Sequence, residues 1–426
     1  MATTSAPISL RSPAVPSPAS VPSSPSASAS ASILLPLDGV ATRYQLPDTA
    51  ELLAGLPSRS GPARSRTAFA AAHVVADPRQ PNGPGLPAAV DWDATLAFRH
   101  HLWSLGLGIA DAMDTAQRGM GLDWPATREL IRRSGAEARA VGGRLACGVG
   151  TDQLGAQLGT PSTGDAHSLK TITAAYEEQW QVVEEAGAQV VLMASRALAR
   201  AASGPDDYAE VYGRLLAQSA EPVILHWLGT PFDPALAGYW GSDDLDAAAE
   251  HVLALIRDHA DKVDGIKVSL LDADREIALR RALPDGVRLY TGDDFHYPEL
   301  IRGDEHGFSH ALLGVFDPLA RHAAAALEAL DRGDTDRYRA VLEPTVPLAR
   351  HVFAAPTRHY KTGVVFLAHL AGHQDHFTMV GGAQEDREVA HLARLFVLAA
   401  EAGALPDPEL AAARMRAILA TKGFEQ

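Results

Sequence analysis

Short runs of apolar residues alternate along most of the chain with longer segments in which apolar residues recur every three or four positions. The first pattern is typical of buried strands, and the second of helices with one buried face. Strands are expected at residues 69–75, 107–113, 145–149, 189–194, 222–227, 263–267, 287–290 and 307–314. Helices are expected at residues 92–105, 124–141, 169–186, 205–218, 245–259 and 319–331, and another helical pattern lies between the sixth and seventh strands.

Eight strands that alternate with helices between residues 67 and 331 predict an α/β fold of the (β/α)8 TIM-barrel class. A doubly wound open sheet is the competing fold. That fold usually has fewer strands and often carries a glycine-rich phosphate loop, and Gly148-Val-Gly150 is too weak a match to count as one.

Both ends of the chain depart from this alternation. Residues 1–32 contain 24 Ser, Ala or Pro, so we expect a disordered tail over residues 1–34. Residues 35–66 form an N-terminal extension, with a hairpin around Asp38-Gly39 and a linker. Residues 332–426 read as a helical extension, with helices at 336–353, 360–370, 385–402 and 408–419.

Charge and cysteine content narrow the classes of partner. The chain of 426 residues carries 37 Lys and Arg against 52 Asp and Glu, a formal charge of −15. Such an acidic surface argues against nucleic acid and anionic membranes as partners. Cys147 is the single cysteine and sits in an apolar strand, which indicates a core residue. No apolar run approaches the ~18 residues of a membrane span, so we expect a cytoplasmic protein.

A charged residue interrupts the apolar pattern at one place. Val263-Asp-Gly-Ile266 reads as a strand that ends on Lys267, and the next strand runs into Gly292-Asp293-Asp294. In TIM-barrel enzymes, the active-site residues lie at the carboxyl ends of the strands. A lysine buried there loses solvation, which lowers its pKa and leaves more of the neutral amine to attack a carbonyl. The alternative is a lysine that only pairs with a barrel carboxylate such as Asp293.

Two segments carry a resemblance to a known family. Gly265-Ile-Lys267-Val-Ser269, followed in the next unit by Tyr290-Thr-Gly-Asp-Asp294, resembles the dihydrodipicolinate synthase and N-acetylneuraminate lyase superfamily, and the chain looks like a divergent, poorly characterised branch of it. The resemblance covers about residues 67 to 331. It implies a TIM barrel in which the strand-six lysine, here Lys267, forms a Schiff base with a carbonyl substrate. It also implies a homo-oligomer.

Two positions depart from that family. Its members have a proton-relaying tyrosine at the end of strand four, where this chain has Met193-Ala-Ser195-Arg196. Their glycine-flanked loop after strand two, which holds the substrate carboxylate, is replaced by Asp114-Thr-Ala-Gln-Arg118. These changes argue against a pyruvate-type substrate. The first hypothesis is therefore a carbon–carbon lyase of class I aldolase type, acting on a 2-keto acid or a sugar-derived carbonyl compound without any cofactor besides the lysine.

The candidate site residues lie at or near the ends of the predicted strands. The catalytic candidates are Lys267 as nucleophile, with His226, Ser195 and Thr115 in proton transfer. The substrate-binding candidates are Arg196, Arg118, Asp293, Asp294, Ser269 and His296. Each has a structural alternative: the arginines in salt bridges, an aspartate in helix capping, and the histidines in half-buried loops.

Two further hypotheses stay open. His73, His226, Asp293 and His296 are the ingredients of a divalent metal site, which would fit a metal-dependent isomerase or a class II-type aldolase. The departures from the family also leave open a barrel that binds a metabolite without turnover. Outside the barrel, His373 and His376 would share a face of a helix, and we expect their segment to pack over the barrel mouth or at a subunit contact rather than to bind metal.

Overall fold

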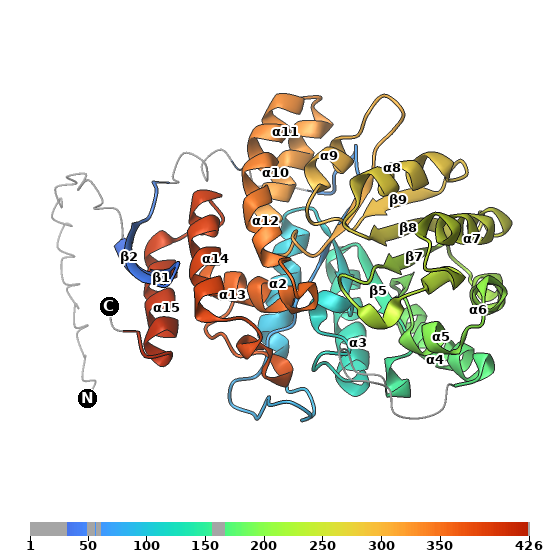
Figure 1. Cartoon of the computed structure of the whole chain (residues 1–426), viewed down its shortest axis with the longest axis horizontal. Helices are drawn as coiled ribbons and strands as arrows, with labels where there is room; N and C mark the ends of the chain where they lie inside the picture. Colours follow the sequence, from blue (N-terminus) through green and yellow to red (C-terminus); the bar gives the residue numbers. More distant parts are fainter. Residues whose placement is uncertain (1–31, 49–55, 57–60, 156–166, 425–426) are drawn as a thin grey trace, which may run out of the picture.

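The computed structural model describes residues 32–48, 56, 61–155 and 167–424 (Figure 1). The chain begins there with a hairpin of two antiparallel strands, β1 (Ser32–Leu37) and β2 (Val40–Gln45), which turns at Asp38 and Gly39 as predicted. Residues 32–34, assigned to the disordered tail, therefore belong to a strand. The rest of the predicted tail lies outside the described residues.

Eight parallel strands close into a barrel, which confirms the predicted TIM-barrel class. They are β3 (Ala68–Ala71), β4 (Gly108–Asp111), β5 (Leu145–Val149), β6 (Gln189–Leu192), β7 (Val223–Leu228), β8 (Val263–Ser269), β9 (Arg288–Thr291) and β10 (His310–Leu313). They pair in chain order, and β10 closes the barrel against β3 with Ala311 opposite Ala68. On β8, Lys267 lies between His226 of β7 and Tyr290 of β9.

Helices surround this barrel (Figure 1). They are α2 (Trp92–Ser104), α3 (Trp124–Val141), α4 (Leu169–Glu185), α5 (Arg196–Ala201), α6 (Pro205–Gln218), α7 (Leu245–Asp258), α8 (Ala273–Ala282), α9 (Tyr297–Arg302) and α10 (Ala320–Asp331). Capping side chains and prolines determine where several of these helices begin. The Asp91 side chain accepts a hydrogen bond from the Ala94 amide at the start of α2, and α3 begins after Asp123 with Pro125 in its first turn.

The direction of each side chain on β8 follows from what packs on either face of the barrel. Ile266 and Val268 belong to the large apolar core shared with the surrounding helices. Because side chains alternate along a strand, Lys267 and Ser269 point the other way, into the barrel. The strand runs two residues past the lysine. The prediction that the strand ends at residue 267 was wrong, because pairing with β7 continues as far as Ser269 opposite Leu228.

The C-terminal extension is helical, as predicted, with one break that was missed. It contains α11 (Thr335–Leu342), α12 (Val346–Val352), α13 (Tyr360–Leu370), α14 (Val389–Glu401) and α15 (Pro408–Thr421). The single helix expected at 336–353 is split by a 3-10 turn at Glu343–Thr345. Pro344 and Pro347 lack the amide hydrogens that an unbroken helix needs there.

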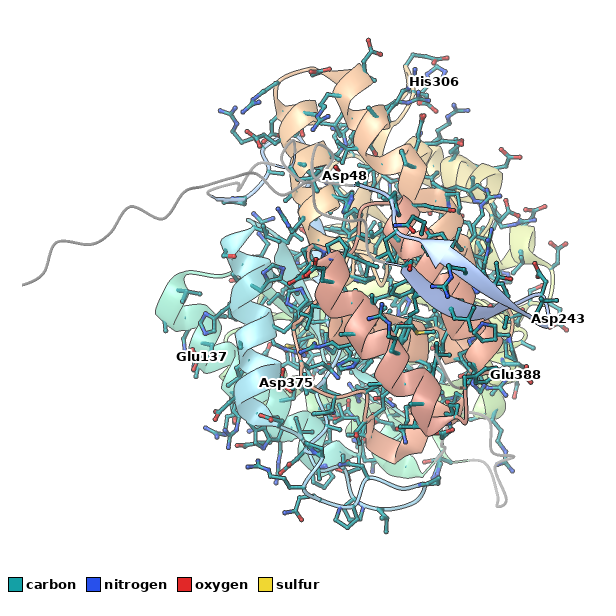
Figure 2. The ribbon with its side chains drawn as sticks, turned by 90° about the vertical axis from the view of Figure 1, so that its left-hand side faces the viewer. Asp48, Glu137, Asp243, His306, Asp375 and Glu388 are labelled. Atoms are coloured by element: carbon teal, nitrogen blue, oxygen red, sulfur yellow. The ribbon has the colours of Figure 1, made fainter. Side chains whose placement is uncertain are left out.

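The hairpin and the extension pack on each other at one end of the molecule. β1 contacts α14 and α15, and the ring of Tyr44 meets the ring of Phe396 edge-on. Figure 2 looks onto this end and shows the hairpin lying over the C-terminal helices. Residues from far apart in the sequence therefore form one body. No helix in the described part of the chain has both the length and the apolar character needed to cross a membrane.

Candidate active site

Lys267 lines a cavity at the carboxyl end of the barrel. Its neighbours in the wall include the polar side chains of Asp114, Thr115, Ser269, Asp294 and Tyr360, and the apolar side chains of Leu228, Phe232 and Phe353. The lysine is only 7% exposed, and burial lowers its pKa, while Asp114 and Asp294 oppose that shift. A buried amine whose pKa is lowered is the form of lysine that can act as a nucleophile.

His226 lies beside this lysine on β7. It is fully buried, and its Nε2 lies 3.3 Å from the Ser269 hydroxyl oxygen. Burial, together with the nearby Lys267, lowers the pKa of His226 to about 3, so the imidazole is neutral near pH 7. Its Nδ1 is buried and has no hydrogen-bond partner among the described residues. An unpaired buried nitrogen is costly, and it is available to a bound ligand.

The two adjacent aspartates after β9 have different surroundings. The Asp293 carboxylate accepts hydrogen bonds from the amides of Phe295 and His296, at 2.8 and 3.0 Å, and lies 2.9 Å from the His296 ring. Asp293 therefore caps the turn into α9, the structural role considered for one of the pair. Asp294 lines the lysine cavity, accepts from the Val315 amide at 2.9 Å, and has its pKa raised by burial.

Two functional candidates in this cavity were not identified from the sequence. Tyr360, the first residue of α13, places its hydroxyl 2.8 Å from the Thr115 hydroxyl. Burial and the nearby Asp114 raise the pKa of Tyr360, so it stays protonated. Asp114 opens the short turn before Thr115 and faces the lysine. Asp114 could have been identified, because it is an acidic residue in the loop after strand two, where the chain differs from the family it resembles. Nothing in the sequence links Tyr360 to the barrel mouth.

A second cavity adjoins the first, and the two share Asp114 and Leu228. Ser195 and Arg196 line it. The Ser195 hydroxyl lies 2.6 Å from that of Thr151 and accepts from the Leu198 amide at the start of α5. Arg196 donates from Nε to Asp233 at 2.5 Å. Two of the predicted residues thus face a cavity that opens beside the lysine, although neither lines the lysine cavity itself.

Arg118 also lines this second cavity, but its guanidinium already ties the loop after β4 to β5, to the turn that follows β5 and to α4. It donates to the carbonyl oxygen of Gly148 at 2.8 Å and to Gln179 at 2.6 Å, and it forms an ion pair with Asp152. This is the salt-bridge alternative considered for it.

The four predicted metal ligands do not come together. His73 pairs with Asp317 at 2.7 Å and stacks near Phe98, whereas His296 pairs with Asp293. Among the described residues, no three His, Cys, Asp or Glu side chains are arranged to hold a metal ion. Asp293 and His296 contact each other, but His73 and His226 have other partners, so the described residues do not bring the four together at one metal site.

The segment with His373 and His376 is not helical. The His373 ring packs 5.0 Å from Phe98 and 4.5 Å from His101, both on α2, while His376 accepts from the Thr378 amide. The two histidines therefore do not form the helical pair that their spacing suggested. The segment joins the extension to the outside of the barrel.

These features define the class of fold as that of the dihydrodipicolinate synthases, as the sequence resemblance implied. Solved structures with this fold include dihydrodipicolinate synthase from Thermotoga maritima (13% identity, TM-score 0.58, 80% of this chain and 100% of that one). Another is the 4-hydroxy-tetrahydrodipicolinate synthase from Methylacidiphilum fumariolicum SolV (16% identity, TM-score 0.58, 81% and 99%). A third is the dihydrodipicolinate synthase from Oceanobacillus iheyensis (16%, 0.54, 84% and 97%).

The chain itself belongs to the family described as "Protein of unknown function (DUF993)", whose model matches residues 33–424. That match includes the hairpin and the C-terminal extension as well as the barrel. No curated protein matches the sequence significantly.

Proposed function

We propose that the protein is a Schiff-base-forming lyase of class I aldolase type, with Lys267 as its nucleophile. The observation that carries the proposal is the buried amine on β8, enclosed with Asp114 and Asp294 at the carboxyl end of the barrel and flanked on β7 by the neutral His226. Surface lysines have no such enclosure. The shared fold supports the same position for the nucleophile as in the synthases.

The chemistry assigned to the cavity is as follows. The neutral amine of Lys267 adds to a carbonyl carbon, and loss of water from the resulting carbinolamine gives an iminium ion. When a base removes the proton of a hydroxyl group on the β carbon, the bond between the α and β carbons breaks. The β carbon leaves as the carbonyl carbon of the first product, and the electron pair of the broken bond moves toward the iminium nitrogen to give an enamine. The enamine that remains is protonated at carbon, and water then releases the second product and regenerates the amine.

Proton transfer falls to the groups that line the cavity. Asp114 and Asp294 are placed to accept a proton, and the Tyr360–Thr115 pair is placed to donate one. Tyr360 supplies, from α13, a buried tyrosine hydroxyl group, and no tyrosine stands at the end of strand four in this chain. His226 holds Ser269 beside the lysine. Arg196 lies in the adjoining cavity, where it is placed to meet the far end of a substrate.

Trapping the iminium tests the proposal. Incubation with sodium cyanoborohydride and a panel of aldehydes and ketones should add the mass of one reduced carbonyl compound, and peptide mapping should place it on Lys267. The Lys267→Met variant should take up none, whereas Lys262→Met, which removes a lysine that lies outside the cavity and bonds the Ser219 carbonyl, should be labelled like the wild type. Absence of any adduct across the panel would reject the function and favour a barrel that binds metabolites without turnover.

The family resemblance further supports a homo-oligomer, and the proposal keeps the cytoplasmic location expected from the sequence. Light scattering on the purified protein measures its mass directly, and a mass of one chain would reject that part of the proposal.

A further inference from the structure

The two adjoining cavities are lined by different basic side chains. The inner cavity, around Lys267, carries the carboxylates of Asp114 and Asp294, and the lysine is the only Lys or Arg in its described wall. The arginines Arg118 and Arg196 line the outer cavity instead. Each arginine is paired there with an aspartate of the same cavity, Arg118 with Asp152 and Arg196 with Asp233, so neither cavity carries a net positive charge.

This distribution decides which groups fit next to the reacting carbonyl. A carbonyl carbon bonded to the lysine nitrogen lies in the inner cavity, and so does any group attached directly to that carbon. In a 2-keto acid that group is a carboxylate, which would be buried beside two aspartates. Like charges a few ångströms apart in a buried site repel strongly. Burial raises the pKa of Asp294 to about 7, so near neutral pH the substrate carboxylate would meet chiefly the charge of Asp114. The single positive charge of an iminium cannot neutralise both of these carboxylates.

Asp114 is the group that matters most, because it keeps its charge. Burial raises the pKa of Asp114, but the positive charges of Lys361, Lys267 and Arg196 act in the opposite direction, and the net effect is a pKa below its usual value. Lys361, buried on α13 next to Tyr360, thus helps to hold a negative charge at the barrel mouth.

Hydroxyl groups, by contrast, find partners in the inner cavity. Carboxylates accept hydrogen bonds, while Ser269, Thr115 and Tyr360 offer hydroxyls that both donate and accept. Phe232 and Phe353 form an apolar wall against which a carbon chain can pack.

We propose that the inner cavity selects an uncharged, hydroxylated aldehyde or ketone and rejects a 2-keto acid. This inference rests on the proposed Schiff-base function and names its substrate class. Formation of the iminium consumes the carbonyl oxygen as water, and the carboxylate of Asp114 or Asp294 accepts the hydroxyl proton when the carbon–carbon bond breaks. No oxidant, reductant or further reactant is needed.

Matched pairs of small carbonyl compounds test it on the full chain. Hydroxyacetone and pyruvate differ only in having CH2OH or a carboxylate beside the same ketone, and dihydroxyacetone and hydroxypyruvate form a second pair. The rate of cyanoborohydride-trapped labelling at Lys267 should be at least about tenfold higher for the uncharged member of each pair, after correction for their rates with free lysine.

Removing the charge of Asp114 provides a second test of the substrate class. Asp114→Asn keeps the shape of the side chain and should raise labelling by pyruvate about tenfold, with a much smaller change for hydroxyacetone. Asp375→Asn is the matched control, because that side chain is 97% exposed on the surface shown in Figure 2. Circular dichroism checks that both variants are folded, and the wild-type comparison stands without them.

Each outcome decides between the claims. Faster labelling by the 2-keto acids, or a preference that Asp114→Asn leaves unchanged, would overturn the substrate class while the Schiff-base function stands. If none of these four compounds labels Lys267 and no compound of the wider panel does so either, both the substrate class and the Schiff-base function are overturned.

Discussion

Lys267 was recognisable from the sequence because a charge that interrupts an apolar strand is rare and because its neighbours matched a known pattern. The residues that surround it were harder to find. Asp114 and Tyr360 are separated from Lys267 by long stretches of chain, and only the closed barrel and the path of α13 bring them to one cavity. Ser195 and Arg196 were predicted for the same cavity as the lysine, but the structure places them in the adjoining one.

Gly292 shows how closely the lysine is packed. A Cβ atom at this position would lie 2.2 Å from the Ser269 hydroxyl oxygen, 2.8 Å from Lys267 Cε and 2.8 Å from the Val268 carbonyl oxygen. Such overlaps force the serine and the lysine out of position. Gly292→Ala should therefore lower the free energy of unfolding by about 1–3 kcal/mol and slow labelling of Lys267.

Denaturant titration and cyanoborohydride trapping measure these two effects. Gly83→Ala is the control, because its new Cβ would meet only Leu86 at 3.6 Å, an ordinary contact. Labelling of Gly292→Ala at the wild-type rate would show that the lysine cavity is looser than the structure implies.

At the scale of elements, alternation of apolar and polar residues predicted most of the fold. The bounds of α3, β5, α6 and α13 agree with the prediction residue for residue, since caps, prolines and glycines mark their ends. The prediction failed at 336–353, where helical spacing continues across a turn that two prolines impose. The barrel closure of β10 on β3 could be inferred only from the number of strands.

One contact between elements carries a pH dependence. Glu276 on α8 is buried and accepts hydrogen bonds from Thr291 of β9 at 3.0 Å and from Ser309 at 2.8 Å. Burial raises its pKa from 4.5 to about 8. The folded protein therefore binds this proton more tightly than the unfolded chain, so the stabilisation is complete below pH 4.5 and is lost as the pH rises toward about 8.

Denaturant titrations at pH 5.5 and 8.5 should show this loss as a decrease of more than about 1 kcal/mol in the free energy of unfolding. Glu276→Gln mimics the protonated acid and should make the dependence less steep, leaving the part due to Asp294, whose pKa burial raises to about 7. Glu305→Gln, at a side chain that is 81% exposed, should leave it as in the wild type. An equally steep dependence in Glu276→Gln would assign the effect to another group.

At the scale of the whole molecule, the extension past residue 331 completes the site. Phe353 and Tyr360 both line the lysine cavity, and their rings stack 4.4 Å apart. The family match over residues 33–424 also treats barrel and extension as one unit. The spacing of apolar residues predicted that the extension is helical, but no active-site residue was predicted in it. Such spacing does not indicate which end of the barrel a helix covers.

The Tyr360–Thr115 contact makes this role testable. Tyr360→Phe removes the hydroxyl that lies 2.8 Å from Thr115 but leaves the ring that packs on Phe353. If Tyr360 donates and receives protons, the variant should still form the trapped adduct at Lys267, because attack of the amine needs no group on α13. The later exchange of protons at carbon should slow by a factor of about 10²–10⁴.

Exchange of the carbon-bound hydrogens of dihydroxyacetone for deuterium, followed by NMR, measures that later step separately from cyanoborohydride trapping. Tyr44→Phe serves as the control, because Tyr44 lies in the hairpin against Phe396, away from the cavity. Loss of trapping and exchange together, with an unchanged melting temperature, would make Tyr360 a residue that shapes the cavity. Retention of both at wild-type rates would remove the extension from the reaction, and proton transfer would then fall to Asp114 and Asp294 alone.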